Sequence, residues 1–142
     1  MNDFITLWNS GRIPIHDGIY FPDGVVFDIS IRYYPSPTII RREPFTIDWR
    51  SIDASWLTSV GETFCLDLFE FGKISLGEGA FGSEGFFAYF NSKNELQWVC
   101  YSECCNPFVM AEDNGNGHVI IDSSADYRIA FDVANPQDMY IL

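Results

Sequence analysis

Residues 85–101 read Gly85-Phe86-Phe87-Ala88-Tyr89-Phe90-Asn91-Ser92-Lys93-Asn94-Glu95-Leu96-Gln97-Trp98-Val99-Cys100-Tyr101. Two runs of aromatic and other strand-favouring residues flank four turn-forming residues, Asn91 to Asn94. This pattern predicts a β-hairpin. The chain then leaves the hairpin through the sequence Cys104-Cys105-Asn106-Pro107-Phe108. We expect the rest of the chain to pack around this hairpin.

The alternation of side chains along the two runs predicts how they pair. If Phe90 faces Glu95, three pairs share one almost wholly apolar face: Tyr89 with Leu96, Phe87 with Trp98, and Gly85 with Cys100. The opposite face is mixed: it holds Phe90 with Glu95, Ala88 with Gln97, and Phe86 with Val99. A slip of one residue would exchange the two faces, so the pattern favours this register.

Other segments before the hairpin also alternate. Residues 25–34 predict a strand with one polar face, and residues 38–47 predict a second strand interrupted at Pro44. The short segment from Asp3 to Trp8 fits either a helix capped by Asp3 or a first strand. A strand is also expected near residues 64–69, followed by a glycine-rich connection over residues 73–82.

One segment has a helical period. A single helical stripe would hold five apolar residues: Trp49, Ile52, Trp56, Leu57 and Val60. Asp48 can cap the start of this helix and Gly61 can close its end. The sequence therefore predicts its main helix at about residues 48–60.

After the hairpin, a turn signal at residues 113–117 separates strands expected at 108–110 and 118–121. Residues 127–131 predict a further strand, and Asn135-Pro136 predicts a break before residues 139–142. The chain has 142 residues and no visible linker, so one domain over residues 1–142 is expected. The predicted fold class is α+β and mostly β: a curved or barrel-like antiparallel sheet with the one main helix packed on it.

The net charge is −12, from 20 acidic and 8 basic residues. Such a chain is a poor candidate for nucleic acid or for an anionic membrane, because both are bound through Lys and Arg. It favours a basic protein partner, although solubility alone also accounts for acidity. The charge is uneven: residues 74–142 hold 10 acids and 2 bases, which makes this half the expected docking side.

The sequence Leu76-Gly77-Glu78-Gly79-Ala80-Phe81-Gly82 matches the glycine-rich phosphate loop of protein kinases. Its context does not fit, since Lys93 is the only later lysine and no Asp-Phe-Gly follows. A turn is the favoured interpretation. A small-ligand or nucleotide-binding module that uses this loop and the mouth of the barrel remains an alternative.

Cys100, Cys104 and Cys105 cluster near the end of the hairpin, and Cys65 lies apart. Their spacing and the two histidines, His16 and His118, leave a zinc site or a cysteine hydrolase that pairs Cys104 or Cys105 with His118 as alternatives. Packing as small apolar thiols is the favoured interpretation. We therefore expect no enzyme activity, no metal and no cofactor.

Residues 94–108 resemble a segment of the small acidic immunity proteins of bacterial polymorphic-toxin systems, including contact-dependent growth inhibition. The similarity rests on a turn followed by Glu95, Leu96 and Trp98, an aromatic strand with Tyr101, the exit Asn106-Pro107-Phe108, and the later Asn135-Pro136. The doubled cysteine before Asn106 departs from the serine-rich exit of such proteins. The resemblance covers the C-terminal part of the chain and transfers no binding residue.

This resemblance implies a binding protein that neutralises a cognate toxin, commonly a nuclease, by covering its basic active-site face. A cytoplasmic location is expected separately, because the sequence shows no signal peptide and no apolar stretch of about 20 residues. A 1:1 complex is expected, with the acidic charge steering association. The candidate contact residues are acids of the second half, selected for charge, for nearby turns and for expected exposure: Glu78, Glu84, Glu103, Glu112, Asp113, Asp122 and Asp126.

Overall fold

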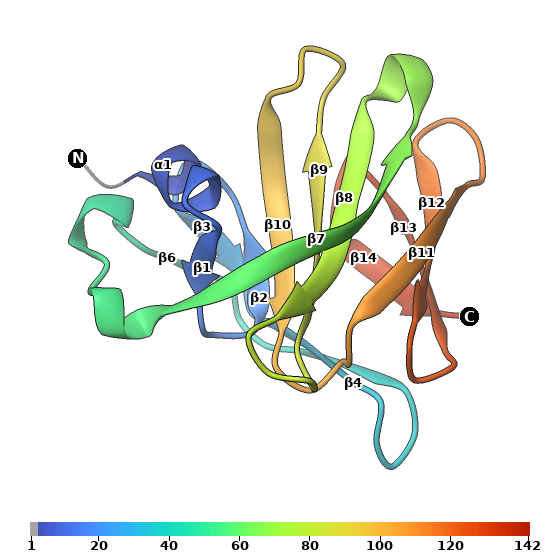
Figure 1. Ribbon diagram of the computed structural model, residues 1–142, viewed down its shortest axis with the longest axis horizontal. Coiled ribbons are helices and arrows are strands. Elements are labelled where there is room, and N and C mark those ends of the chain that lie inside the picture. Colours follow the sequence, from blue (N-terminus) through green and yellow to red (C-terminus); the bar gives the residue numbers. More distant parts are fainter. Residues whose placement is uncertain (1–2) are drawn as a thin grey trace.

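The computed structural model describes residues 3–142 (Figure 1). Its elements, in chain order, are α1 (Phe4–Asn9), β1 (Arg12–Pro14), β2 (Gly18–Tyr20), β3 (Val25–Phe27), β4 (Ile29–Arg32), β5 (Thr38–Arg41), β6 (Phe45–Thr46), β7 (Leu57–Asp67), β8 (Lys73–Gly79), β9 (Gly85–Phe90), β10 (Leu96–Ser102), β11 (Phe108–Asp113), β12 (His118–Ser123), β13 (Arg128–Asp132) and β14 (Asn135–Ile141). Three short 3-10 turns lie at Trp49–Ser51, Ala54–Trp56 and Phe69–Phe71.

Antiparallel strands form three sheets. The largest has the order β1-β7-β8-β9-β10-β2-β3-β6 and curls strongly, and the second has the order β11-β12-β13-β14. Strands β4 and β5 pair only with each other and project from the body as a hairpin (Figure 1). The mostly β fold with a curled antiparallel sheet is therefore confirmed.

Two cores flank the central hairpin. On one face of the large sheet, Phe87 and Trp98 pack with the inner face of the C-terminal sheet, which supplies Phe131 among others. On the other face, Phe86 and Tyr101 pack beneath α1 and the 3-10 turn that carries Trp49. Because both faces of β9 and β10 are buried, this hairpin forms the middle layer of the molecule.

The hairpin at residues 85–102 is confirmed, but its predicted register is wrong. Phe90 lies opposite Leu96, Tyr89 opposite Trp98, and Phe87 opposite Cys100. The amide of Asn91 donates to the carbonyl of Glu95, so the turn is confined to residues 92–94 and is shorter than predicted. The register shifts again between Leu96 and Trp98. The two shifts keep Trp98 on the face of Phe87 and move Leu96 into the other core. The opposite face is thus a second core rather than a mixed surface.

The predicted main helix at residues 48–60 is wrong, and α1 is the only α-helix in the described residues. Asp48 does act as a cap, but of a 3-10 turn, where it accepts from the amide of Arg50 at 3.1 Å. Asp53 caps a second such turn through the amide of Ser55. These local hydrogen bonds compete with a continuous helix. From Leu57 onward the chain is instead extended in β7, paired with β1 and β8.

Two further boundaries differ from the prediction. The segment expected to be a glycine-rich connection is mostly strand β8, which lies between β7 and β9 and buries Ile74 and Leu76. The break expected at Asn135-Pro136 is the start of β14, an edge strand in which Pro136 is tolerated. The turn at residues 113–117, the strands on each side of it and the strand near 127–131 are confirmed, and the segment at residues 3–8 is helical.

Candidate partner-binding surface on the C-terminal sheet

The C-terminal sheet has one buried face and one exposed face. Ala111, Val119, Ile121, Ile129 and Met139 point into the core. Their neighbours along each strand point the other way, because side chains alternate across a sheet. We call the resulting surface, which belongs to β11–β14, the outer face.

Cross-strand rows organise the outer face. In the central row Glu112 lies opposite Ile120, Ile120 opposite Ala130, and Ala130 opposite Tyr140. Tyr140 is 57% exposed and Ile120 is half-buried, so apolar groups are presented at the centre of the sheet. Met110, from the next row, is 52% exposed and extends this apolar surface.

Arg128 joins three strands on this face. Its Nε donates to Asp122 at 2.7 Å, and its Nη2 donates to Glu112 at 2.7 Å. The hydrogen bonds with these two carboxylates, Asp122 before Glu112, raise the pKa of Arg128. One cation thus holds two anions, and the network keeps a net negative charge beside the apolar row.

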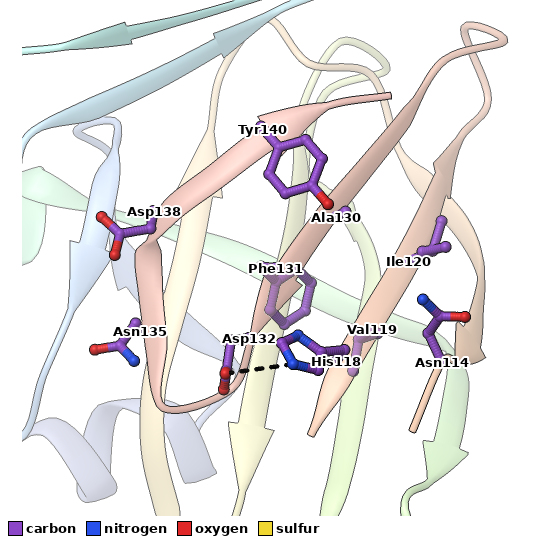
Figure 2. A pocket seen from close by; sticks show the side chains of 10 residues that line it. All are labelled: Asn114, His118, Val119, Ile120, Ala130, Phe131, Asp132, Asn135, Asp138 and Tyr140. Atoms are coloured by element: carbon purple, nitrogen blue, oxygen red, sulfur yellow. Dashed lines mark ion pairs between the residues drawn. The ribbon is translucent and has the colours of Figure 1, made fainter. Parts of the chain in front are cut away.

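A hollow of about 300 Å³ lies between β12, β13 and β14. Figure 2 shows His118 and Asp132 at one end of it and Tyr140 at the other. His118 Nε2 is 3.9 Å from Asp132 Oδ2, and Asp138 adds a further carboxylate on β14. The hollow combines carboxylates with an aromatic ring, a composition whose charge complements a basic protein surface.

The edge of this sheet is covered, whereas its outer face is open. Arg41 of β5 donates to the carbonyls of Gln137, at 3.3 Å, and of Met139. These carbonyls belong to the edge strand β14, so Arg41 occupies acceptors that an added strand would need. A partner would therefore meet side chains of the outer face rather than extend the sheet at this position.

Four of the seven predicted contact residues belong to the C-terminal sheet and its turns. Glu112 and Asp122 flank Arg128, Asp113 ends β11, and Asp126 lies in the turn before β13. They extend from the outer face to both ends of β12. These four residues, which were selected for charge, nearby turns and expected exposure, thus lie on or beside the candidate surface.

The other three predicted acids lie elsewhere. Glu78 is exposed near the end of β8, and Glu103 is exposed just after β10, where its amide donates to Asp17 at 2.8 Å. Glu84, selected because exposure was expected, is instead 3% exposed. Its carboxylate is held by Tyr101 and by the amide of Phe81, so it is a structural residue and not a surface contact.

Sequence reasoning missed Met110, Asp132, Asp138 and Tyr140. Their signal was present in the period of two along β12 and β13, which aligns His118, Ile120 and Asp122 on one face. It could not be read without knowing that β13 pairs with β14 through Ala130 and Tyr140. The outer face therefore becomes visible only when the strand order is known.

The structure keeps the Cys105 thiol apart from the imidazole of His118. Cys105 is buried, and its carbonyl accepts from Ser123 Oγ at 3.1 Å, next to the end of β12. His118 starts the same strand, and five residues of strand span roughly 16 Å. Burial also raises the pKa of the Cys105 thiol, which disfavours the reactive thiolate. Cys105 and His118 are thus not brought together; Cys104 is exposed.

The glycine-rich sequence is not arranged as a phosphate loop. Gly77 and Glu78 are paired on both sides in β8, with Gly77 opposite Glu62 on β7 and Phe86 on β9, and Gly79 is paired with Val60 on β7. Within residues 3–142, no group of three or more His, Cys, Asp or Glu side chains is placed to hold a metal ion. The same residues include no helix with the length and apolar character that crossing a membrane requires.

Comparisons of the chain with protein-family models, with curated proteins and with solved structures find no match.

Proposed function

We propose that this protein is an immunity or inhibitor protein, which binds a cognate bacterial toxin and covers its basic active-site face in a 1:1 complex. The proposal is carried by the outer face of the C-terminal sheet. There, exposed Met110 and Tyr140 stand among the carboxylates of Glu112, Asp122 and Asp132.

The charge of this part of the chain supports a basic partner. Residues 108–142 contain six acids against one arginine and one histidine. A nuclease must present cations to phosphates, so a nuclease domain is the toxin class that such a surface fits best. Complementary charge speeds the encounter of the two proteins. An exposed aromatic residue such as Tyr140, which becomes buried when the complex forms, slows its dissociation.

A co-expression experiment tests the proposal. A candidate toxin domain from a neighbouring reading frame would be induced in bacteria with and without the full-length protein, and survival would be counted. We expect survival only with the protein, together with a 1:1 complex on size-exclusion chromatography coupled to light scattering. Continued killing, or survival without a complex, would reject the proposal.

Surface variants then locate the contact. Tyr140→Ala and Met110→Ser should each weaken the complex by about 2 kcal/mol, or roughly 30-fold, if they are anchors. Ile5→Ala is the matched control, because Ile5 is also an exposed apolar residue, 42% exposed, but belongs to α1. Affinity measured by calorimetry should also fall as salt is raised, and equal affinity at low and high salt would remove the steering role.

A further inference from the structure

An aromatic hollow of about 470 Å³ opens beside the outer face, between the large sheet and the C-terminal sheet. We call it the mouth. Its walls are rich in aromatic and amide side chains: Phe21, Phe71, Tyr89, Trp98, Gln97 and Asn116. Asp132 is the carboxylate at its rim, and this same residue lines the hollow of the outer face, so the two hollows adjoin.

The aromatic walls of the mouth are held in place by hydrogen bonds. Tyr89 donates its hydroxyl to the carbonyl of Phe71 at 2.5 Å, and Trp98 donates Nε1 to the carbonyl of Val133 at 3.0 Å. The rings of Tyr89 and Trp98 lie 6.0 Å apart between centroids, tilted by 38°. Their polar atoms are thus occupied, while Tyr89 remains half-buried with ring surface at the mouth.

Asp132 has one oxygen free for a ligand. Its Oδ1 accepts from the amide of Ala134 at 2.8 Å, which fixes the carboxylate. Its Oδ2 is 3.9 Å from His118 Nε2, too far for a hydrogen bond, and accepts none within the described part of the chain. A fixed carboxylate beside aromatic surface is the combination that attracts organic cations.

We propose that the mouth receives an arginine side chain of the basic partner. The guanidinium would stack on the ring of Tyr89 and donate to Asp132 Oδ2, while the amides of Gln97 and Asn116 offer acceptors. A planar guanidinium suits this site better than an ammonium, because it can stack and hydrogen-bond together. This inference rests on the proposed function for the partner's identity, but the pocket can be tested without a partner.

The direct test titrates N-acetyl-arginine amide into the full-length, ¹⁵N-labelled protein. We expect saturable NMR shifts of the side-chain signals of Trp98 and Gln97, with a dissociation constant on the order of millimolar. N-acetyl-citrulline amide has nearly the same shape without the charge and should not saturate. Equal shifts with both compounds, or none with either, would overturn the inference, and tighter binding of N-acetyl-lysine amide would overturn the choice of arginine.

Variants assign the site. Asp132→Asn keeps the oxygen that accepts from Ala134 and should weaken binding of N-acetyl-arginine amide about tenfold. Tyr89→Leu should weaken it about threefold. Glu62→Gln, at an exposed acid of β7 that does not line the mouth, is the control and should stay within about twofold of the unmodified protein. If the control lost as much binding as Asp132→Asn, the effect would come from the total charge of the protein and not from Asp132, and the inference would be overturned.

The toxin complex separates the two proposals. If the toxin is neutralised and Asp132→Asn and Tyr89→Leu bind it as tightly as the unmodified protein, the arginine inference is wrong and the proposed function stands. If the mouth binds N-acetyl-arginine amide but no toxin is neutralised, the proposed function is wrong and the cation site stands.

Discussion

Tyr101 donates its hydroxyl hydrogen bond to the carboxylate of Glu84 in the interior of the protein. Tyr101 is fully buried and Glu84 is 3% exposed. The other carboxylate oxygen accepts from the amide of Phe81 at 3.1 Å, so Glu84 ties the connection between β8 and β9 to strand β10. Burial, and next the bond to Glu84, raises the pKa of Tyr101, which therefore stays a donor at neutral pH.

Removing the Glu84 side chain should be costly for stability. Glu84→Ala leaves the hydroxyl of Tyr101 buried without an acceptor, and we expect the free energy of unfolding to fall by about 3 kcal/mol. Glu78→Ala is the matched control, because Glu78 is an exposed acid nearby in sequence, and it should change stability by less than about 0.5 kcal/mol. Urea unfolding measures both, and equal losses would show that Glu84 has no special structural role.

The glycine-rich sequence supplies a second contrast. A Cβ at Gly77 would lie 2.1 Å from the carbonyl oxygen of Gly61 on the neighbouring strand, whereas a Cβ at Gly82 would meet nothing within 4 Å. Gly77→Ala should therefore lower the free energy of unfolding by at least about 2 kcal/mol. Gly82→Ala should be neutral or slightly stabilising, through the lower entropy of the unfolded chain. A similar urea midpoint for both variants would contradict the close approach of β7 and β8.

These two residues also show what the sequence could and could not predict. The hairpin at residues 85–102 was predictable because its aromatic runs and its turn are local signals. The role of Gly77 was not, since the reason for a glycine there is the backbone of β7, which approaches from another part of the sequence. Glu84 was misjudged likewise, because its hydroxyl partner lies on β10.

The false helix at residues 48–60 has a related cause. The helical stripe from Trp49 to Val60 was real, but one of its members, Trp49, packs on α1 in the second core while Val60 belongs to the paired strand β7. Long-range strand pairing outweighed a local period. For the candidate surface, the sequence predicted Glu112, Asp113, Asp122 and Asp126 from charge, nearby turns and expected exposure, which are local signals. The apolar centre emerged only from the pairing of β12, β13 and β14.

The four thiols should divide into two classes. Cys65 and Cys104 are exposed, whereas Cys100 and Cys105 are buried. Burial raises the pKa of the Cys100 and Cys105 thiols well above the ordinary value, so they are both inaccessible and protonated. Intact-mass analysis after iodoacetamide treatment should give two adducts on the native protein and four in urea. Labelling of Cys100 or Cys105 before Cys65 and Cys104 would contradict the burial of these two thiols in the core.

Partial burial and neighbouring acids near the end of β10 raise the pKa of Glu103. Burial is the largest cause, and the charges of Asp17 and Glu84 come next. A carboxyl whose pKa is higher in the folded state stabilises the fold below its unfolded-state pKa, and this contribution is lost as pH rises through the folded-state value. The contribution of Glu103 to the free energy of unfolding therefore decreases as the pH rises from weakly acid values. A carboxylate in an ion pair usually behaves in the opposite way.

Asp17→Asn provides the test of this coupling. Asparagine keeps an oxygen that can accept from the amide of Glu103 but removes the negative charge, so the pKa of Glu103 should fall toward its ordinary value. Carboxyl ¹³C shifts followed against pH measure this pKa directly. Asp138→Asn is the control, because Asp138 lies on β14, does not perturb Glu103, and should leave the pKa of Glu103 unchanged when it is neutralised. A fall of equal size in both variants would show that the total charge, rather than the nearby Asp17, sets the titration of Glu103.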